Sequence, residues 1–168
     1  MIVICASLAA LALPAAALAF GISAGDGQLV VQNASGLKNV PVVALTITGA
    51  VIGHIDAGKI IIDDPTPNNG ISPEVTGTTT GALWHKDVSG HDTAQLWGGT
   101  DFKFRAVGGK YTVLIYGSGI DVVALGNGTV TLTGIPDSPT GDGRYALNGG
   151  EFHSLPGAAR QLDIRSNG

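Results

Sequence analysis

The sequence has very little cysteine. Its one cysteine, Cys5, lies in the apolar N-terminal stretch. A domain formed by residues 20–168 would therefore have no disulfide within it and no cysteine nucleophile. Charge is also sparse: Lys, Arg, Asp and Glu make up 13% of the chain, and the formal net charge is −4. The nine basic residues are scattered and form no basic stripe, which argues against nucleic acid as a partner.

Motifs of metalloprotease catalysis and phosphate binding are missing as well. The chain has no H-E-x-x-H pair, and Ser118 lies between two β-branched runs and not at a strand-to-helix corner. The glycines of GSGIDVVALGNG at 117–128 do not have G-x-G-x-x-G spacing, and no amphipathic helix follows them. We therefore predict turns there, with no catalytic and no cofactor-binding residue in the chain.

What the sequence has in abundance is glycine, with 26 residues, together with many Val, Ile and Thr. Helix-forming Glu, Lys and Gln are few. This composition favours short strands joined by tight turns, and the hydrophobic fraction of 44% is too high for a disordered chain. The sequence predicts an all-β protein.

The first nineteen residues, MIVICASLAALALPAAALA, carry no charge and end in an A-x-A site. That layout predicts a secretory signal peptide at 1–19, although no basic residue precedes the apolar run. A membrane anchor is the alternative, and the abundant alanine and Pro14 make it the weaker one. We expect a secreted or cell-envelope protein with no stable membrane insertion after cleavage, and a short linker at 20–27.

Residues 28–155 are predicted to form a single β domain. Alternation is clear at 59–63 and at 101–106, where Phe102 and Phe104 share one side. Two packed antiparallel sheets, sandwich-like, are the preferred architecture, with 101–106 pairing with 110–116 in a hairpin. The alternative is a short β-solenoid, because glycine recurs at roughly eight-to-ten-residue spacing; it predicts parallel stacking of 120–125 on a neighbouring rung.

A weak internal repeat appears at a shift of about 70 residues, which places IDAGKIII on LGNGTVTL. Because the shift is even, equivalent side chains would face the same way. The repeat predicts two pseudo-repeated halves, 28–63 and 101–134. Residues 64–98 are rich in turn residues and are predicted to be the loop between the halves, and 156–168 a loosely held C-terminal tail.

The strongest candidate for chemistry is the stretch WHKDVSGHD at 84–92. It brings His85, Asp87, His91 and Asp92 close together in sequence, and imidazole and carboxylate groups are ligands for zinc and similar ions. The spacing matches no known motif. A solvated loop is therefore the preferred interpretation, and a metal site is the alternative.

A second candidate is a polar strand face with His54 and Asp56, which Asp63 and Asp64 could join across the following turn to form a carboxylate cluster. An exposed polar edge is the preferred interpretation. Four aromatic residues could form a sugar platform, but packing in the core is the more common role of aromatic residues on strands. They are Trp84, Trp97, Tyr111 and Tyr116.

The stretches GGTDFKFRAVGGKYTVLIYGSGIDVVALGNGTVTLTG and YALNGGEFHSLP resemble the C-terminal half of uncharacterised short exported proteins of high-GC Gram-positive bacteria. GDGQLVVQNASG and GAVIGHIDAGKIIIDDP are similar to the N-terminal half of the same group. The resemblance implies export and a β-rich domain, and it implies no activity and no site residue.

These features together predict an exported, non-enzymatic protein that binds or builds in the cell envelope or extracellular space, with a cell-envelope glycan or protein as partner. Two alternatives remain open. One is a metal-dependent or carbohydrate-active extracellular enzyme, and the other is a surface protein that self-assembles through exposed strand edges.

Overall fold

The computed structural model describes residues 25–36, 42–66, 72–86, 92–134 and 143–165. In that part of the chain the protein is all-β, as the composition predicts, and no helix there is long and apolar enough to cross a membrane. The described strands form one antiparallel sheet of seven strands. They are β1 (Gly27–Gln32), β2 (Val42–Asp63), β3 (Glu74–Lys86), β4 (Asp92–Thr133), β5 (Arg144–Leu147), β6 (His153–Ser154) and β7 (Arg160–Ile164).

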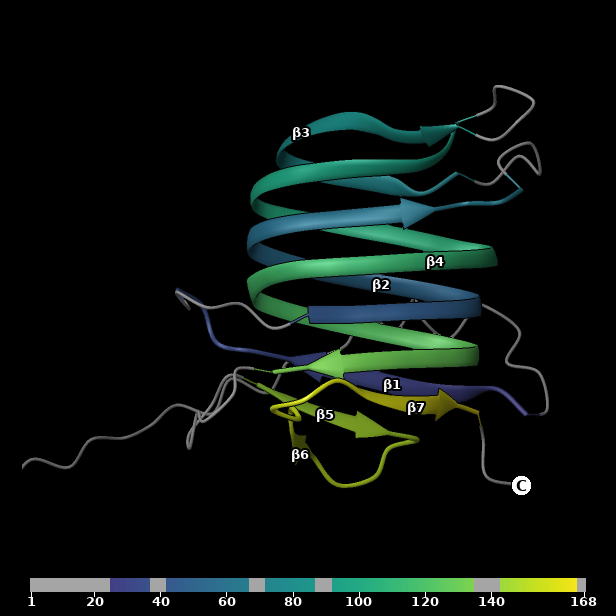
Figure 1. Cartoon of the computed structure of the whole chain (residues 1–168), viewed down its shortest axis with the longest axis vertical. Helices are drawn as coiled ribbons and strands as arrows, with labels where there is room; N and C mark the ends of the chain where they lie inside the picture. The colour runs from purple at the N-terminus through teal and green to yellow at the C-terminus, as the bar shows by residue number, and fades with distance from the viewer. Residues whose placement is uncertain (1–24, 37–41, 67–71, 87–91, 135–142, 166–168) are drawn as a thin grey trace, which may run out of the picture.

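Two very long strands dominate the molecule. β2 has 22 residues and β4 has 42, whereas strands in globular proteins usually have three to ten. Figure 1 shows that both strands wind around a common axis, so that each passes along the front and the back of the molecule. β2 lies between two passes of β4: Ile62, for example, pairs with Gln95 on one side and with Val113 on the other.

Glycines mark the corners of this winding. Gly49 and Gly58 lie nine residues apart on β2, half a turn of the coil, and each is flanked by glycines on both passes of β4. The strands therefore bend together, one above the other. The two rows are Gly109–Gly49–Gly126 and Gly99–Gly58–Gly117.

The reason for glycine is close backbone approach. A Cβ at Gly49 would overlap the carbonyl oxygen of Leu125, and one at Gly126 would overlap the carbonyl oxygen of Thr48. Both glycines also have positive φ, +147° and +141°, which other residues rarely adopt. A side chain at either position would overlap the neighbouring strand, so glycine lets the strands bend here and stay paired.

The core lies inside the coil. On β2 the side chains of Val43, Leu45 and Ile47 alternate inward with outward neighbours, and Phe102 and Phe104 point inward from β4. The alternation predicted at 59–63 and 101–106 is confirmed, because Ile60 and Ile62, like Phe102 and Phe104, share the buried side of their strand. Burial of these apolar side chains is the main force that holds the winding together.

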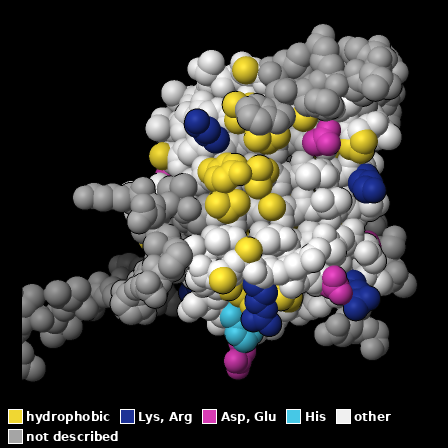
Figure 2. Space-filling model, viewed as in Figure 1, with side chains coloured by type: hydrophobic (Ala, Val, Ile, Leu, Met, Phe, Trp, Pro, Cys, Tyr) yellow, Lys and Arg dark blue, Asp and Glu magenta, His cyan; other side chains and the backbone are white. Residues whose placement is uncertain are grey.

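The outer side of the coil also carries small and apolar side chains. Figure 2 shows hydrophobic side chains gathered near the middle of one face. The register places Ala44, Leu114 and Ile61 side by side across β2 and β4, each half-buried. The low charge of the sequence thus leaves parts of the surface weakly polar.

The predicted two packed sheets are not confirmed, because the described strands belong to one sheet. The predicted hairpin is wrong: 101–106 pairs with β2 and β3, and 110–116 pairs with β2. Gly108 and Gly109 look like a hairpin turn in the sequence, yet here the strand bends and continues. Pairing with the strands on adjacent turns of the coil, and not the local turn signal, decides which segment lies next to 101–106.

The solenoid alternative is also corrected. Residues 120–125 pair antiparallel with β1 and β2, so no parallel rung stacks on them. The glycine spacing that suggested rungs does correspond to the half-turns of the coil. A second strand, β2, is wound between successive turns of β4, and spacing alone does not reveal it.

The predicted loop at 64–98 contains β3 and the start of β4, so it is not a plain connection. Threonine and glycine dominate β3, and without apolar alternation the stretch gave no strand signal. The halves 28–63 and 101–134 are wound together in one sheet; the first comprises β1 and β2, and the second lies within β4.

The predicted loose tail is wrong as well. β7, within 156–168, pairs with residues 128–132 of β4, and Ile164 is fully buried. Asn148 holds this end, because its side chain accepts a hydrogen bond from the Gln28 N–H (2.9 Å) and donates one to the Arg165 carbonyl oxygen (2.8 Å). The turn at Asn148-Gly149-Gly150 joins β5 to β6, which pair antiparallel as a hairpin.

Candidate binding groove

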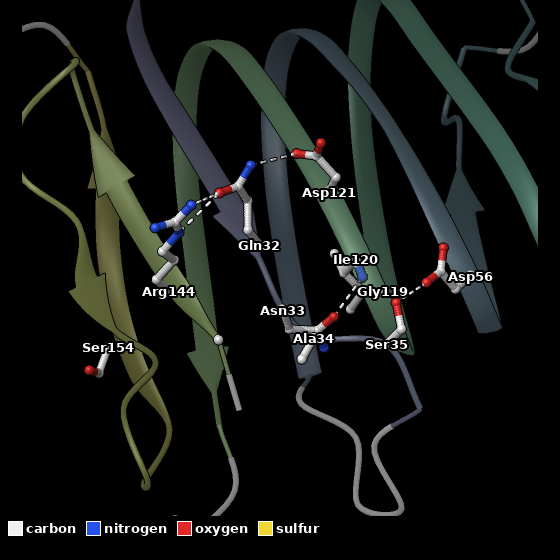
Figure 3. Close-up of a pocket in the computed structure, with 11 residues that line it drawn as sticks. Gln32, Asn33, Ala34, Ser35, Asp56, Gly119, Ile120, Asp121, Arg144 and Ser154 are labelled. Atoms are coloured by element: carbon white, nitrogen blue, oxygen red, sulfur yellow. Dashed lines mark hydrogen bonds between the residues drawn. The ribbon is translucent and has the colours of Figure 1, made fainter. Parts of the chain in front are cut away.

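An open groove of about 640 Å³ lies where β1 ends, between a corner of β4 and strands β5 and β6. Seven of the eleven residues that line it have polar or charged side chains. Figure 3 shows these side chains along the strands that border the groove. They are Gln32, Asn33, Ser35, Asp56, Asp121, Arg144 and Ser154.

Asn33 fixes the floor of the groove. Its backbone N–H donates to the Ile120 carbonyl oxygen (2.9 Å), and its side-chain oxygen accepts from the Ile120 N–H (2.6 Å). Its side-chain nitrogen donates to the carbonyl oxygen of Gly117 (2.9 Å). These bonds extend the pairing of β1 with β4 past the last residue of β1 and hold the segment that follows in place.

A chain of hydrogen bonds crosses the groove on three neighbouring strands. Nε and Nη2 of Arg144 donate to Oε1 of Gln32 (3.0 and 2.9 Å), and Nε2 of Gln32 donates to Oδ1 of Asp121 (3.3 Å). The three residues are direct cross-strand partners, so the sheet register itself aligns them. Gln32 thereby bridges the guanidinium of Arg144 and the carboxylate of Asp121. Both charged groups are oriented before any ligand binds.

An aromatic ring lies beside this chain. The guanidinium carbon of Arg144 is 4.4 Å from the ring centre of Phe152, which is 47% exposed. Among the described residues, Phe152 and Tyr116 are the large hydrophobic side chains that remain exposed. Stacking on the ring restrains the long arginine side chain and leaves apolar surface next to polar groups.

The row of partners continues to His54, whose cross-strand neighbours are Asp121 and Lys103. The ring of His54 lies between two carboxylates: Nε2 is 2.9 Å from Oδ1 of Asp101, and Nδ1 is 3.5 Å from Oδ1 of Asp56. Asp56 also accepts a hydrogen bond from Ser35, on the segment after β1. The groove and this histidine thus share Asp56.

Asp101 reaches His54 because of a bulge. It has a φ of +50°, and the pairing of β3 with β4 shifts register between Gly77 and Thr78, opposite it. A bulge re-aims a side chain that would otherwise follow the regular alternation. Together the groups around the groove can donate and accept several hydrogen bonds to a polar ligand.

The predicted metal ligands lie elsewhere. His85 is on β3 and Asp92 begins β4, and the register of Lys86 with Asp92 shows that these ends meet in a hairpin. Asp87 and His91 lie outside the described residues, so the predicted site stays a prediction. Among the residues that the structure describes, no group of three or more His, Cys, Asp or Glu could hold a metal ion.

The predicted cluster of His54, Asp56 and Asp63 is not formed as proposed. His54 and Asp56 do meet, but Asp63 lies further along the same strand, because Ala57-Gly58 is a bend within β2 and not a reversal. Asp101 takes the place that was predicted for Asp63. One oxygen each of Asp63 and Asp64 is buried without a hydrogen-bond partner among the described residues.

Two of the four aromatic residues pack in or against the core, which agrees with the interpretation preferred over a sugar platform. Tyr111 is fully buried, with its hydroxyl donating to the Val107 carbonyl oxygen (2.9 Å), and Trp97 packs against the core. Burial raises the pKa of Tyr111, and the nearby Asp64 carboxylate raises it further. Tyr116 is 38% exposed, and the side chain of Trp84 lies outside the described residues.

Sequence reasoning missed Gln32, Arg144 and Asp101. The two hydrogen-bonded links of Gln32 span 89 and 112 positions of sequence, so no local pattern could join these residues. The available signals were weak, because Gln32 and Arg144 are polar residues at the ends of short strands. Only the register of the sheet brings them together.

Comparisons with known proteins leave the groove to be interpreted from its own chemistry. No family model matches the chain, and neither a curated protein nor a solved structure matches it.

Proposed function

We propose that the protein is an exported, non-enzymatic binding protein of the cell envelope or extracellular space, and that the groove at the end of β1 binds a glycan. The observation that carries the proposal is the aligned chain Arg144–Gln32–Asp121 beside the exposed ring of Phe152. The apolar N-terminal stretch and the resemblance to exported proteins of high-GC Gram-positive bacteria support the location.

The chemistry of a glycan suits these groups. Sugar hydroxyls both donate and accept hydrogen bonds, and the groove offers a guanidinium, two amides, two carboxylates and two hydroxyls. Figure 3 shows the second oxygen of Asp121 pointing away from Gln32. The C–H faces of a sugar ring can pack on an aromatic ring such as Phe152. Because the polar groups are already oriented by the sheet, little side-chain entropy is lost on binding.

The test is co-sedimentation of the purified protein with isolated cell envelopes, before and after periodate treatment of the envelopes. Periodate cleaves vicinal diols of sugars, so we expect saturable binding that periodate abolishes. Arg144→Ala should weaken binding about tenfold or more, since it removes a charged donor and the restraint on Gln32. Lys110→Ala is the matched control, because it removes the same charge from an exposed site away from the groove.

An equal loss of binding in both variants would contradict a glycan site at this groove. Saturable binding that survives periodate but is abolished by protease treatment of the envelopes would contradict it as well, and would indicate a protein partner.

One observation favours a second candidate, a carbohydrate-active enzyme. His54 is in contact with Asp101 and close to Asp56, which lines the groove, and a histidine oriented by a carboxylate can act as a general base. New reducing ends released from the envelope glycan by the protein, but not by a His54→Ala variant, would support it. Binding without release of reducing ends would support the non-enzymatic function.

A further inference from the structure

The outer edge of β3 is a second feature that calls for a partner, independent of the groove. In the part of the chain that the structure describes, β3 pairs only with β4, at one end of the coil. Its described side chains, residues 74–82, are all exposed or half-exposed. No described residue pairs with the other side of this 13-residue strand, so its backbone N–H and C=O groups there have no strand partner within that part of the chain.

Natural edge strands are usually guarded against pairing with another chain by lysine, proline or short length. Between Val75 and Leu83, β3 has no charged residue and no proline. At the other end of the coil, β5, β6 and β7 have only four, two and five residues. The chain thus blunts one end of its sheet and leaves the other with a long edge strand that is uncharged between Val75 and Leu83.

The sequence of this edge is nearly the same read in both directions. In VTGTTTGAL the pattern is symmetric about Thr79: Gly77 mirrors Gly81, and Thr78 mirrors Thr80. A strand that pairs antiparallel with its own copy around Thr79 would place glycine opposite glycine and threonine opposite threonine. Cross-strand threonine pairs are favourable, and such self-complementarity is the requirement of a two-fold interface.

The bend in β3 also lies at Thr79, the centre of the sequence symmetry. Thr79 pairs with Gly99, which belongs to the corner row of Gly58 and Gly117. β3 therefore bends at the point about which its sequence is symmetric. An antiparallel copy centred on Thr79 would bend at the same point, as β2 and β4 do where they pair in this molecule.

We propose that two copies of the chain join through β3, antiparallel and centred on Thr79, so that the two coils continue into one sheet. The interface joins the end of one coil to the same end of its copy, and the blunted ends point outward. The assembly is therefore a closed dimer and not a fibre.

Sedimentation velocity of the purified protein over a range of concentrations tests the proposal, with paired charge variants. Thr78→Lys with Thr80→Lys places lysine opposite lysine at both sites and should weaken dimerisation about tenfold or more. Thr78→Lys with Thr80→Glu changes the same two exposed positions but places lysine opposite glutamate, and it should keep the dimer at low salt. Far-UV circular dichroism checks that both variants keep the β-fold.

A wild-type protein that stays monomeric at the highest concentration reached would overturn the proposal, as would equal dimerisation of the two variants. Cysteine variants test the proposed register of the two β3 strands. In a Cys5→Ser background, Thr79→Cys should form a disulfide between copies, because the residue faces itself across the two-fold axis. Thr76→Cys should not, since its partner in this register is Ala82.

Discussion

At Gly49 the backbone of β2 bends with a φ of +147°, and the carbonyl oxygen of Leu125 occupies the place where a side chain would begin. The bend and the close approach are parts of one arrangement, because the strand can turn the corner only while its neighbours turn with it. A methyl group added at position 49 would therefore disturb the packing of all three strands in the row Gly109–Gly49–Gly126.

We expect Gly49→Ala to lower the free energy of unfolding by about 2–4 kcal/mol, through backbone overlap and unfavourable φ. Gly98→Ala is the matched control on β4. A Cβ there would meet Cγ of Lys59 at 3.5 Å and the Gly58 carbonyl oxygen at 3.7 Å, which are ordinary contacts. Urea denaturation measures both, and losses of similar size would show that the corner does not require glycine.

Tyr111 links the stability of the fold to alkaline pH. Burial, and then the Asp64 carboxylate, raise the pKa of its hydroxyl above the ordinary value of 10.0. Above about pH 10 this tyrosine ionises in the unfolded chain but stays protonated in the folded one. The contribution is thus intact below pH 10 and is lost as the pH rises through the folded pKa.

We therefore expect Tyr111→Phe to flatten the fall of the unfolding free energy above pH 10, at a cost of about 1 kcal/mol at neutral pH for the lost bond to Val107. Tyr116→Phe, at an exposed tyrosine, should leave the alkaline slope as it is in the wild type. Urea titrations at several pH values give the slopes. Identical slopes for both variants would rule out Tyr111 as the source.

At the scale of elements, β7 closes the blunted end of the coil. It pairs with the last turn of β4, and its Ile164 enters the core that β1 and β2 also line. A short strand near the C-terminus therefore covers apolar surface that would otherwise be exposed.

Truncation of this side chain tests the role of β7. Ile164→Ala should cost about 2–5 kcal/mol of unfolding free energy, as expected for a fully buried isoleucine. Gln161→Ala, at an exposed position of the same strand, should stay within about 0.5 kcal/mol of wild type. Thermal or urea unfolding compares the two, and a small effect at Ile164 would mean that the core closes without β7.

At the scale of the whole molecule, the groove and the open edge of β3 lie on different parts of the coil. The groove borders β1, β5 and β6, which belong to the blunted end of the sheet. Dimerisation through β3 would leave that end exposed. Two copies of the groove in one dimer would then raise the avidity for a repetitive glycan, without any new contact to the sugar.

The amino-acid sequence by itself determined the all-β class and the inward sides of its strands. Alternation of Phe102 and Phe104 with charged neighbours, and of Ile60 and Ile62 on β2, predicts burial because successive side chains of a strand face opposite ways. It also showed glycine at half-turn spacing. These are local properties, and the physics behind them acts over a few residues.

Only the tertiary structure decided which strands are neighbours, and with them the groove. Gly108 and Gly109 bend β4 and do not reverse it, because β2 continues past them as a paired neighbour. Gln32 meets Asp121 and Arg144 only when three distant segments pair in register. Such pairing depends on burying one shared core by the whole chain, and that requirement cannot be read from any single segment.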